Sequence, residues 1–271
     1  MSVTTTPLRW AGSKRKSLEI INKYWLSKDF KTYVEPFSGS AAFHFYANPD
    51  KSIISDINSD LINFWQCLRD SPIEIYEIVS SFRNDKDEYY NIRSSFNCDQ
   101  LDKVSRASYF LYLNRFCFNG LWRVNKSGGF NVPYGGQRAG RMPDQEMLLS
   151  CSARLRNALL YNEDFQFLEN IELDKDTMVY LDPPYQSSTR RSFVEYSKVG
   201  FNQNDENRVM ELLNNLDARG ISFLMSYRGD FDDYNIPGTW SVEFNQVIRN
   251  VGGFSKSRKM DSEIFISNMV L

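Results

Sequence analysis

The sequence predicts an α/β protein with a mainly parallel sheet. Three short runs rich in Val, Ile and Tyr alternate with stretches whose apolar residues recur at helical spacing, and these runs are residues 32–34, 52–55 and 177–181. Such alternation is typical of βαβ units, in which the strands are parallel. An acidic residue directly follows each run: Glu35, Asp56 and Asp182. Because ligands bind beyond the carboxyl ends of parallel strands, the acids indicate a binding site at one edge of the sheet.

Helical and extended patterns continue on both sides of a central segment. Before that segment, helical spacing predicts helices at residues 16–25 and 40–46. After it, the expected helices are residues 150–160 and 206–216, and the expected further strands are residues 165–168, 221–225 and 262–267. Gly220 follows the second of these helices, in the position where glycine commonly ends a helix.

The central segment, residues 58–145, differs from its surroundings. Its first part reads as helical to about residue 100, and another helix is expected at residues 104–113. Gly, Asn and aromatic residues interleaved with Arg follow, and residues 125–129 predict a hairpin turn. We therefore expect one α/β domain, residues 1–57 and 146–271, that is split around a mainly helical insert carrying a β-hairpin.

The charge of the chain is nearly balanced but unevenly distributed. There are 32 Lys and Arg and 34 Asp and Glu, and a net charge of −2 argues mildly against a nucleic-acid-binding protein. Residues 114–142, however, hold five basic residues and no acidic one, and residues 247–259 hold four. Two basic patches on a neutral body suit a protein that binds a polyanion along one face. The alternative interpretation is a pair of solvated loops.

The residue inventory disfavours several kinds of site. His44 is the one histidine, and the sequence has no H-E-x-x-H, G-x-S-x-G or phosphate-loop motif, so we expect neither a metal site nor a Ser-His-Asp triad. No apolar run approaches the ~20 residues of a membrane span, and the first residues show no signal-peptide pattern. The four cysteines form no C-x-x-C pair, which favours reduced thiols. These features predict a cytoplasmic protein without membrane association.

The run Asp182-Pro183-Pro184-Tyr185 directly follows the apolar strand at residues 177–181. Two prolines end the strand and stiffen the turn, so a carboxylate, a rigid carbonyl and an aromatic ring lie within four residues. This set can hold an amino group on a heteroaromatic ring: Asp182 accepts one N–H, the Pro183 carbonyl accepts the other, and Tyr185 stacks on the ring. The alternative interpretation is an acidic strand end with a Pro-Pro turn.

A second motif, Glu35-Pro36-Phe37-Ser38-Gly39-Ser40-Ala41-Ala42, lies between a predicted strand and a predicted helix. Its small residues let the backbone approach a ligand, and the helix N-terminus offers free N–H groups. Asp56 ends the next strand, at the position that binds ribose hydroxyls in nucleotide-binding folds. By themselves, these features fit any nucleotide-binding fold.

Together the motifs resemble the Dam-type (D12 class, alpha-group) DNA adenine-N6 methyltransferases. The resemblance begins at Arg9-Trp10-Ala11-Gly12-Ser13-Lys14, continues through the loop at residues 35–42, and includes residues 114–123 and 129–135 of the insert before Asp182-Pro183-Pro184-Tyr185. The motifs also occur in the order of the family. The resemblance implies a Rossmann-like sheet that uses S-adenosylmethionine (SAM), with residues 58–145 as an inserted target-recognition domain.

The resemblance implies a role for each matched residue of the catalytic domain. SAM is the implied cofactor, S-adenosylhomocysteine its product, and no metal is needed. The implied cofactor-binding residues are Trp10, Ala11, Lys14, Glu35, Phe37, Gly39, Asp56 and Asp182. The implied catalytic residues, which hold a flipped-out adenine, are Asp182, Pro183, Pro184 and Tyr185.

The implied partner is double-stranded DNA, bound by a monomer or weak dimer in a prokaryotic or phage-infected cell. The implied DNA-binding residues are Arg9, Phe118, Asn119, Leu121, Arg123, Asn125, Pro133 and Arg138. Arg123 could form hydrogen bonds to a guanine edge, and Leu121 and Pro133 could contact a thymine methyl group. These implied contacts point to GATC or a related GAT-containing site. Gly136 departs from the family, which often has a basic residue there, and this puts one phosphate contact in doubt.

The sequence bears on four alternatives to adenine methylation. A small-molecule or RNA methyltransferase would leave the basic and aromatic residues of the hairpin region unexplained. Cytosine C5 methylation needs a nucleophilic cysteine, usually after a proline, and no cysteine here follows one. Cytosine N4 methylation uses the same amine geometry and stays open, as does a DNA-binding homologue that has lost catalysis. The sequence also leaves open whether the enzyme belongs to a restriction–modification pair or acts alone.

Overall fold

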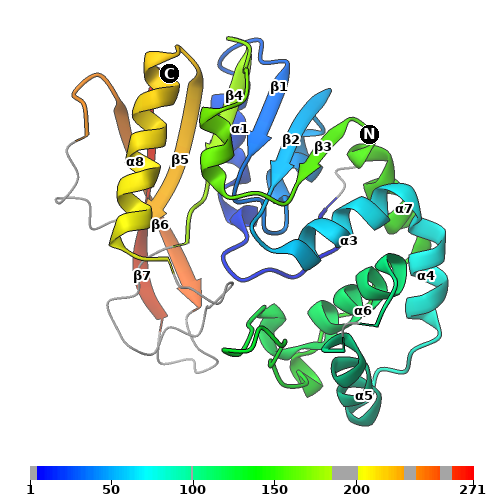
Figure 1. Cartoon of the computed structure of the whole chain (residues 1–271). Helices are drawn as coiled ribbons and strands as arrows, with labels where there is room; N and C mark the ends of the chain where they lie inside the picture. The colour runs from blue at the N-terminus through cyan, green and yellow to red at the C-terminus, as the bar shows by residue number, and fades with distance from the viewer. Residues whose placement is uncertain (1–4, 99, 185–200, 229–235, 251–257) are drawn as a thin grey trace.

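A computed structural model describes residues 5–98, 100–184, 201–228, 236–250 and 258–271, and it describes side chains in these ranges except at 246–250 and 258–262. Its centre is a seven-stranded sheet with the order β3-β2-β1-β4-β5-β7-β6 (Figure 1). The strands are β1 (Thr32–Glu35), β2 (Lys51–Ser55), β3 (Ala158–Tyr161), β4 (Thr177–Leu181), β5 (Ser222–Arg228), β6 (Ser241–Asn250) and β7 (Arg258–Ser267).

The first five strands are parallel and β6 and β7 form an antiparallel pair at one end of the sheet. The order β3-β2-β1-β4-β5 is that of a doubly wound Rossmann-like sheet, so the predicted α/β class is confirmed. The strand order reverses between β1 and β4, which places the ends of these two strands at the point where such folds bind ligands.

Helices cover both faces of the sheet, because alternate residues of each strand point to opposite sides. Met178 and Tyr180 of β4 join one buried cluster, whereas Val179 and Leu181 join the other. The second cluster lies under α8 (Gln203–Ala218), which runs alongside β5 in Figure 1. The first cluster includes residues of α1 (Leu18–Trp25) and α2 (Ala42–Ala47).

The central segment forms four helices to one side of the sheet (Figure 1): α3 (Ser59–Asp70), α4 (Pro72–Ser80), α5 (Lys86–Phe96) and α6 (Lys103–Phe116). The side chains of Asn58, Asp85 and Asp102 cap three of them by accepting backbone N–H groups of the first turn. The core of these helices is continuous with the sheet, since one buried cluster contains both Tyr33 of β1 and Phe110 of α6.

The predicted hairpin turn is confirmed. Val124 and Phe130 form an antiparallel bridge, and Asn125 N–H donates to the Gly129 carbonyl over 2.8 Å. Trp122, which is 2% exposed, packs from this hairpin onto Phe110 with ring centroids 4.1 Å apart. The short 3-10 turns η2 (Phe118–Gly120) and η3 (Gly136–Arg138) flank the hairpin.

One helix predicted after the insert has the wrong bounds, and one predicted strand is wrong. The helix expected at residues 150–160 is α7 (Gln145–Leu155), and residues 158–161 instead form β3. The burial of this edge strand alternates, but its exposed residues Leu159 and Tyr161 are apolar, so the sequence shows no alternation of apolar and polar residues. The strand is defined by its pairing with β2. The strand expected at residues 165–168 is the 3-10 helix η4 (Phe165–Glu169), because the Asp164 carboxylate accepts the Gln166 N–H and caps a helical turn.

The C-terminal part contains a strand that was not predicted. Residues 241–250 form β6, and β7 begins at residue 258, four residues before the expected strand. Phe244 is 70% exposed at this edge, and that exposure hides the inside–outside alternation that would mark a strand. Residues 247–250 and 258–259 of the basic stretch therefore belong to a strand pair, and residues 251–257 lie outside the described residues.

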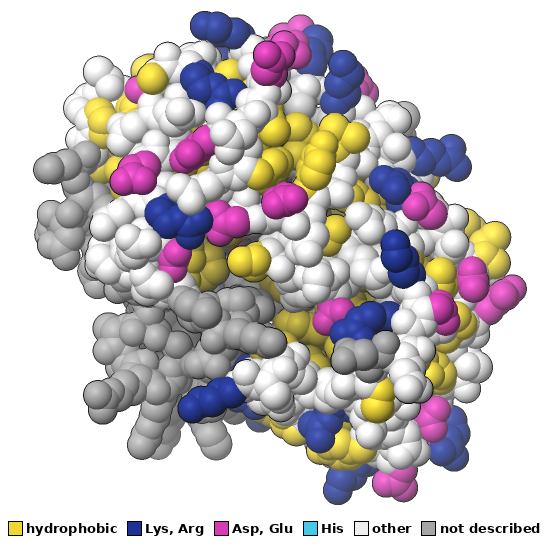
Figure 2. Space-filling model, viewed as in Figure 1, with side chains coloured by type: hydrophobic (Ala, Val, Ile, Leu, Met, Phe, Trp, Pro, Cys, Tyr) yellow, Lys and Arg dark blue, Asp and Glu magenta, His cyan; other side chains and the backbone are white. Residues whose placement is uncertain are grey.

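In the described part of the chain, no helix has the length and apolar character needed to cross a bilayer. Over the face shown in Figure 2, acidic and basic side chains are interspersed, in keeping with the small net charge.

Candidate active site

Asp182 stands directly beyond the carboxyl end of β4, as predicted, and its side chain is 19% exposed. Its Oδ1 atom accepts hydrogen bonds from Ser226 Oγ at 3.0 Å and from Lys14 Nζ at 2.8 Å. No described residue donates to the other oxygen, Oδ2. Pro183 is buried and Pro184 half-buried, whereas Tyr185 lies outside the described residues. One oxygen of the carboxylate is thus anchored and the other is left for a ligand.

Lys14 reaches this carboxylate from the N-terminal segment, where it begins the 3-10 turn η1 (Lys14–Lys16). Its ammonium lies 2.8 Å from Asp182 Oδ1 and 2.8 Å from Oε1 of Glu263, which is on β7. Ser17 Oγ donates to Glu263 Oε2 over 2.6 Å. Lys14 is 7% exposed and Glu263 is 2% exposed, so the group is an almost buried ion triad.

The sequence singled out Lys14 and Asp182 but not Glu263 or Ser226. A signal for Glu263 was present in the sequence, since it is an acid next to the apolar residues of a predicted strand. A charged residue is rarely buried without a partner, so an acid in such a strand indicates an ion pair. Burial raises the pKa of Asp182, and the Lys14 ammonium opposes that shift while the Glu263 carboxylate adds to it.

Glu35 occupies the end of β1, beside the switch in strand order, and is 4% exposed. Burial raises its pKa well above the usual range, and the nearby charges of Asp182 and Asp56 act in the same direction. Its Oε2 atom and the hydroxyl of Ser38 are buried without a hydrogen-bond partner among the described residues. Buried polar atoms are almost always paired, so these two atoms fit a site that takes a polar ligand.

Asp56, beyond β2, holds the loop that follows β1. Its Oδ2 accepts the Gly39 N–H at 3.0 Å and its Oδ1 accepts the Asn58 N–H at 2.9 Å. Burial raises the pKa of Asp56 to about 6, and the two backbone hydrogen bonds limit the rise. The predicted cofactor residues Gly39 and Asp56 are therefore in direct contact.

Trp10 lies against the same loop. Gly39 has φ +44°, and a Cβ atom added there would come within 2.7 Å of Trp10 Nε1. Ala11 is half-buried in the turn closed by the hydrogen bond from Ser13 N–H to the Trp10 carbonyl. The loop can approach the indole this closely only because residue 39 has no side chain.

Phe37, the remaining predicted cofactor residue, lies on the opposite side of the loop. Its ring centroid is 5.0 Å from that of Phe165 and 6.3 Å from that of Phe201. Phe165 was not predicted as a site residue, because residues 165–168 were expected to form a strand.

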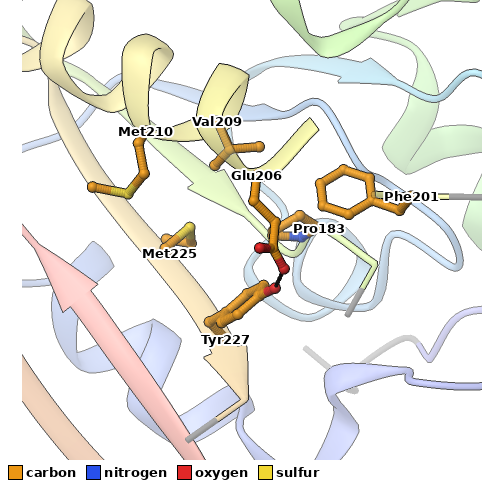
Figure 3. Close-up of a pocket in the computed structure, with 7 residues that line it drawn as sticks. All are labelled: Pro183, Phe201, Glu206, Val209, Met210, Met225 and Tyr227. Atoms are coloured by element: carbon orange, nitrogen blue, oxygen red, sulfur yellow. Dashed lines mark hydrogen bonds between the residues drawn. The ribbon is translucent and has the colours of Figure 1, made fainter. Parts of the chain in front are cut away.

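A small pocket adjoins Pro183 on the α8 side of the sheet (Figure 3). Its lining residues are Pro183, Phe201, Glu206, Val209, Met210, Met225 and Tyr227. Within it, the Tyr227 hydroxyl donates to Glu206 Oε1, which leaves a mainly apolar wall of methionine and aromatic side chains.

Comparison with known proteins now assigns the family. A model of the D12 class N6 adenine-specific DNA methyltransferases matches residues 10–252. The chain belongs to this family. It is 35% identical to the Type II methyltransferase M.MjaIII of Methanocaldococcus jannaschii, over 83% of this chain and 85% of that protein.

Two further relatives cover most of the chain. The Type II methyltransferase M1.LlaDCHI of Lactococcus lactis subsp. cremoris is 32% identical over 96% of this chain and 94% of its own length. A DNA adenine methylase of Vibrio cholerae is 35% identical over 81% and 79%. The protein is thus an adenine-specific DNA methyltransferase, and membership of this family implies that it uses SAM. Among the described residues, no group of three or more His, Cys, Asp or Glu side chains could hold a metal ion.

In this D12-class methyltransferase, Arg9 is fixed to the insert through its backbone. Arg9 N–H donates to Asn114 Oδ1 at 2.9 Å, and Asn114 Nδ2 donates to the Arg9 carbonyl at 2.6 Å. The Arg9 guanidinium also donates to the Arg115 carbonyl at 3.1 Å. Asn114 is fully buried and was not predicted to have a role; the signal for it was a polar residue within an apolar helix.

The hairpin of the methyltransferase presents the predicted base-reading residues. Arg123 Nε donates to Asn131 Oδ1 at 2.8 Å, and Leu121 is half-buried against the core. Pro133 is exposed. Asn125 has a structural role in the turn, because its Oδ1 accepts from Ser127 N, Ser127 Oγ and Gly129 N.

Phe118 and Asn119 lie at the start of this region. The Arg138 guanidinium is 5.4 Å from the centroid of the half-buried Phe118 ring. Asn119 is exposed and has φ +56°, an uncommon backbone conformation for a residue other than glycine. Trp122 connects the hairpin with the cofactor side, since its ring stacks on Trp10 with centroids 6.5 Å apart and an interplanar angle of 15°.

Proposed function

We propose that this methyltransferase modifies N6 of an adenine flipped out of double-stranded DNA, in GATC or a related GAT-containing site, and that Asp182 positions the reacting amine. The observation that carries the assignment of Asp182 is its anchored geometry at the end of β4. Lys14 and Ser226 both donate to Oδ1, and Oδ2 is left for an N–H of the substrate. The Pro183 carbonyl accepts the second N–H, and Tyr185 stacks on the base.

Extrusion of the base is required because an adenine inside a duplex is out of reach, and it costs roughly a few kcal/mol. Stacking on an aromatic ring recovers about 1–3 kcal/mol of this. Two acceptors on one amine orient the nitrogen lone pair, so the contribution of the protein is alignment of the reacting atoms. The side chains named here form no covalent intermediate with the base.

SAM supplies a methyl group that is activated by its sulfonium centre. The residues that would hold it are Trp10, Ala11, Lys14, Glu35, Phe37, Gly39, Asp56 and Asp182. The unpartnered buried atoms Glu35 Oε2 and Ser38 Oγ support a polar ligand at this place. Asp56 would accept the ribose hydroxyls in addition to the two backbone N–H groups that it already holds.

We assign target recognition to the insert, residues 58–145. Leu121, Arg123 and Pro133 of the insert, together with Arg9 of the N-terminal segment, would contact base edges. Phe118 and Asn119 would support the duplex where the adenine has left, and Asn125 and Arg138 would bind the DNA backbone. The half-buried Arg123, oriented by Asn131, supports this assignment, because an ordered guanidinium can form two directed hydrogen bonds to a guanine.

The experiment is to treat unmethylated DNA with enzyme and SAM and then to identify the methylated base and its sequence context. We expect N6-methyladenine in GAT-containing sites. N4-methylcytosine would establish the alternative reaction, and an unmodified product would indicate a DNA-binding homologue without catalysis.

Replacing Asp182 by Asn tests its role. Loss of one hydrogen bond made in the transition state lowers rates by about 10²–10³-fold, and we expect a fall of that size while SAM binding is largely retained. Asp29→Asn is the control, because Asp29 is 87% exposed and pairs with Lys31 at the surface. Full activity of Asp182→Asn would refute the assigned role.

Two relatives are named Type II methyltransferases, which supports a partnership with a restriction endonuclease. Such an enzyme would act in the cytoplasm on the DNA of its own cell, as a monomer or weak dimer. DNA methylated by the protein should then resist a nuclease that cleaves the same unmodified site.

A further inference from the structure

Glu263 is a buried carboxylate beside the methyl-transfer site. It lies on β7 and is 2% exposed, with Oε1 2.8 Å from Lys14 Nζ and Oε2 accepting from Ser17 Oγ at 2.6 Å. A buried carboxylate is strongly unfavourable unless it is paired and hydrogen-bonded, and Glu263 meets both conditions. It also lies beyond residues 10–252, the part of the chain that the family model matches.

Lys14 is shared between Glu263 and Asp182. Its ammonium is 2.8 Å from Asp182 Oδ1, and Ser226 Oγ donates to that same oxygen. The Tyr180 hydroxyl is in turn 2.8 Å from Ser226 Oγ. Because the donors converge on Oδ1, the position of the ammonium sets the direction in which Oδ2 points.

We propose that Glu263 is a positioning residue for methyl transfer, which holds Lys14 between two carboxylates and thereby aims Asp182 Oδ2 at the substrate amine. Without the Glu263 carboxylate, the Lys14 ammonium loses one of the two carboxylates that restrain it, so Asp182 Oδ1 is held less firmly. The proposal rests on the proposed role of Asp182 in binding that amine.

The charge balance of the triad supports the same role. One ammonium and two carboxylates leave one net negative charge in the triad, which would suit the sulfonium cation of a bound SAM. Neutralising Glu263 removes that charge and leaves Lys14 and Asp182 as a neutral pair.

Glu263 also affects the protonation of Asp182. The ionisable groups that interact with Asp182 from the surrounding elements are Lys14 of η1, Glu263 of β7, and Glu35 and Tyr33 of β1. Tyr180 of β4 faces it through Ser226, whose Oγ lies 2.8 Å from the Tyr180 hydroxyl. Of these, the Glu263 carboxylate raises the pKa of Asp182 and the Lys14 ammonium lowers it. Removing the charge of Glu263 therefore moves the acidic limb of the rate profile to lower pH.

The test is Glu263→Gln, which keeps the size of the side chain and removes its charge. A misaligned reacting group can cost about 10²-fold in rate, so we expect kcat to fall by about 10- to 100-fold with little change in KM for DNA. The acidic limb of the kcat profile should shift downward in pH, which a purely structural defect would not cause. Wild-type kcat with an unchanged pH profile would overturn the proposal.

Glu243→Gln is the matched control. Glu243 lies on the neighbouring strand β6 and accepts a hydrogen bond from the Tyr24 hydroxyl, as Glu263 does from Ser17. We expect this variant to keep the kcat and the pH profile of the wild type. If kcat fell as much in Glu243→Gln as in Glu263→Gln, any change in the β6–β7 strand pair would impair the enzyme. That result would also overturn the proposal.

A double-mutant cycle tests the route through Lys14. If Glu263 acts by holding Lys14, Glu263→Gln should have little further effect on kcat in a Lys14→Gln background. An undiminished effect there would overturn this route. Should Glu263→Gln fail to fold, Ser17→Ala releases Oε2 without changing charge, and an unchanged kcat in that variant contradicts the proposal.

Asp182→Asn is assayed alongside these variants. If Asp182→Asn loses activity and Glu263→Gln keeps it, the proposed role of Glu263 is rejected and that of Asp182 is retained. Full activity in Asp182→Asn would reject the proposed function of Asp182 on which that role depends.

Discussion

At the scale of single residues, the site is defined by carboxylates in different environments. Asp182 is ion-paired with Lys14, Glu35 is buried with Oε2 unpartnered among the described residues, and Asp56 is held by two backbone N–H groups. These differences follow from what each strand end meets. Glu35 is the last residue of β1, whereas Asp56 and Asp182 directly follow β2 and β4.

The protonation of Asp56 predicts a pH dependence of SAM binding. Burial raises its pKa to about 6, so the carboxylate that would accept the ribose hydroxyls is lost as pH falls through that value. The SAM dissociation constant, measured by titration calorimetry between pH 8 and pH 5, should rise below about pH 6. An affinity that does not change over this range would contradict the role of Asp56.

The raised pKa of Asp56 affects folding stability in the opposite direction from SAM binding: low pH weakens SAM binding but favours the folded state. A carboxyl group whose pKa is raised by folding stabilises the folded state below its unfolded pKa, and this contribution is lost as pH rises through the folded value of about 6. Asp56→Asn, which does not titrate, serves as the control in both measurements.

At the scale of elements, the loop at residues 35–42 and the hairpin at residues 122–132 both pack against Trp10. The loop after β1 brings Gly39 against Trp10, and the hairpin brings Trp122 against the same indole. The loop was predicted from its small residues, but its contact with Trp10 was not, because the two segments are distant in sequence.

Gly39→Ala should disrupt the cofactor loop. The new Cβ would clash with Trp10 Nε1 at 2.7 Å, and φ +44° is unfavourable for alanine. We expect a destabilisation of about 1–3 kcal/mol and weaker SAM binding, measured by chemical denaturation and calorimetry.

Gly238→Ala is the matched control, since nothing lies within 4 Å of a Cβ atom there. If both variants bind SAM equally well, the close approach of Trp10 and Gly39 does not shape the cofactor site.

Arg123→Ala tests the hairpin as a reader of sequence. Loss of a guanidinium that contacts a guanine should cost about 1–3 kcal/mol of discrimination at one base pair, measured as kcat/KM on single-substitution sites. Lys126→Ala, an exposed turn residue of the same hairpin, should change affinity for all sequences alike. Should Arg123→Ala behave in that way too, Arg123 contacts a phosphate.

At the scale of the whole molecule, the insert and the sheet share one buried cluster. The cluster extends from Tyr33 and Ile54 in the sheet to Phe110 and Trp122 in the insert. The insert is therefore separate in sequence pattern but not in packing, and the proposed boundary at residues 58–145 marks a change of role rather than a break in the core.

This shared core predicts that the protein unfolds in one transition. The calorimetric and van't Hoff enthalpies of unfolding should agree. Trp122→Ala should lower the free energy of unfolding of the whole protein by about 3–5 kcal/mol, still in a single transition. Leu149→Ala, at a 41% exposed position, should have little effect. Two separate transitions, with Trp122→Ala affecting one of them, would show that the insert folds independently.

The sequence by itself determined the features that depend on near neighbours. The acids at strand ends, the loop at residues 35–42, the Asn125–Gly129 turn and Gly220 at the end of α8 arise from local backbone preferences, which a sequence displays directly. Residues 158–161 and 241–250 were missed because edge strands are defined by their partners rather than by their own pattern.

Only the tertiary structure decided how the charged groups of the site are paired. Lys14, Asp182 and Glu263 come from distant parts of the chain and meet because β7 pairs with β5 beside β4. Burial makes an unpaired charge costly, so each group needs a partner, but which partner it finds depends on the strand order. That pairing, rather than any local motif, leaves Asp182 anchored through one oxygen and open at the other.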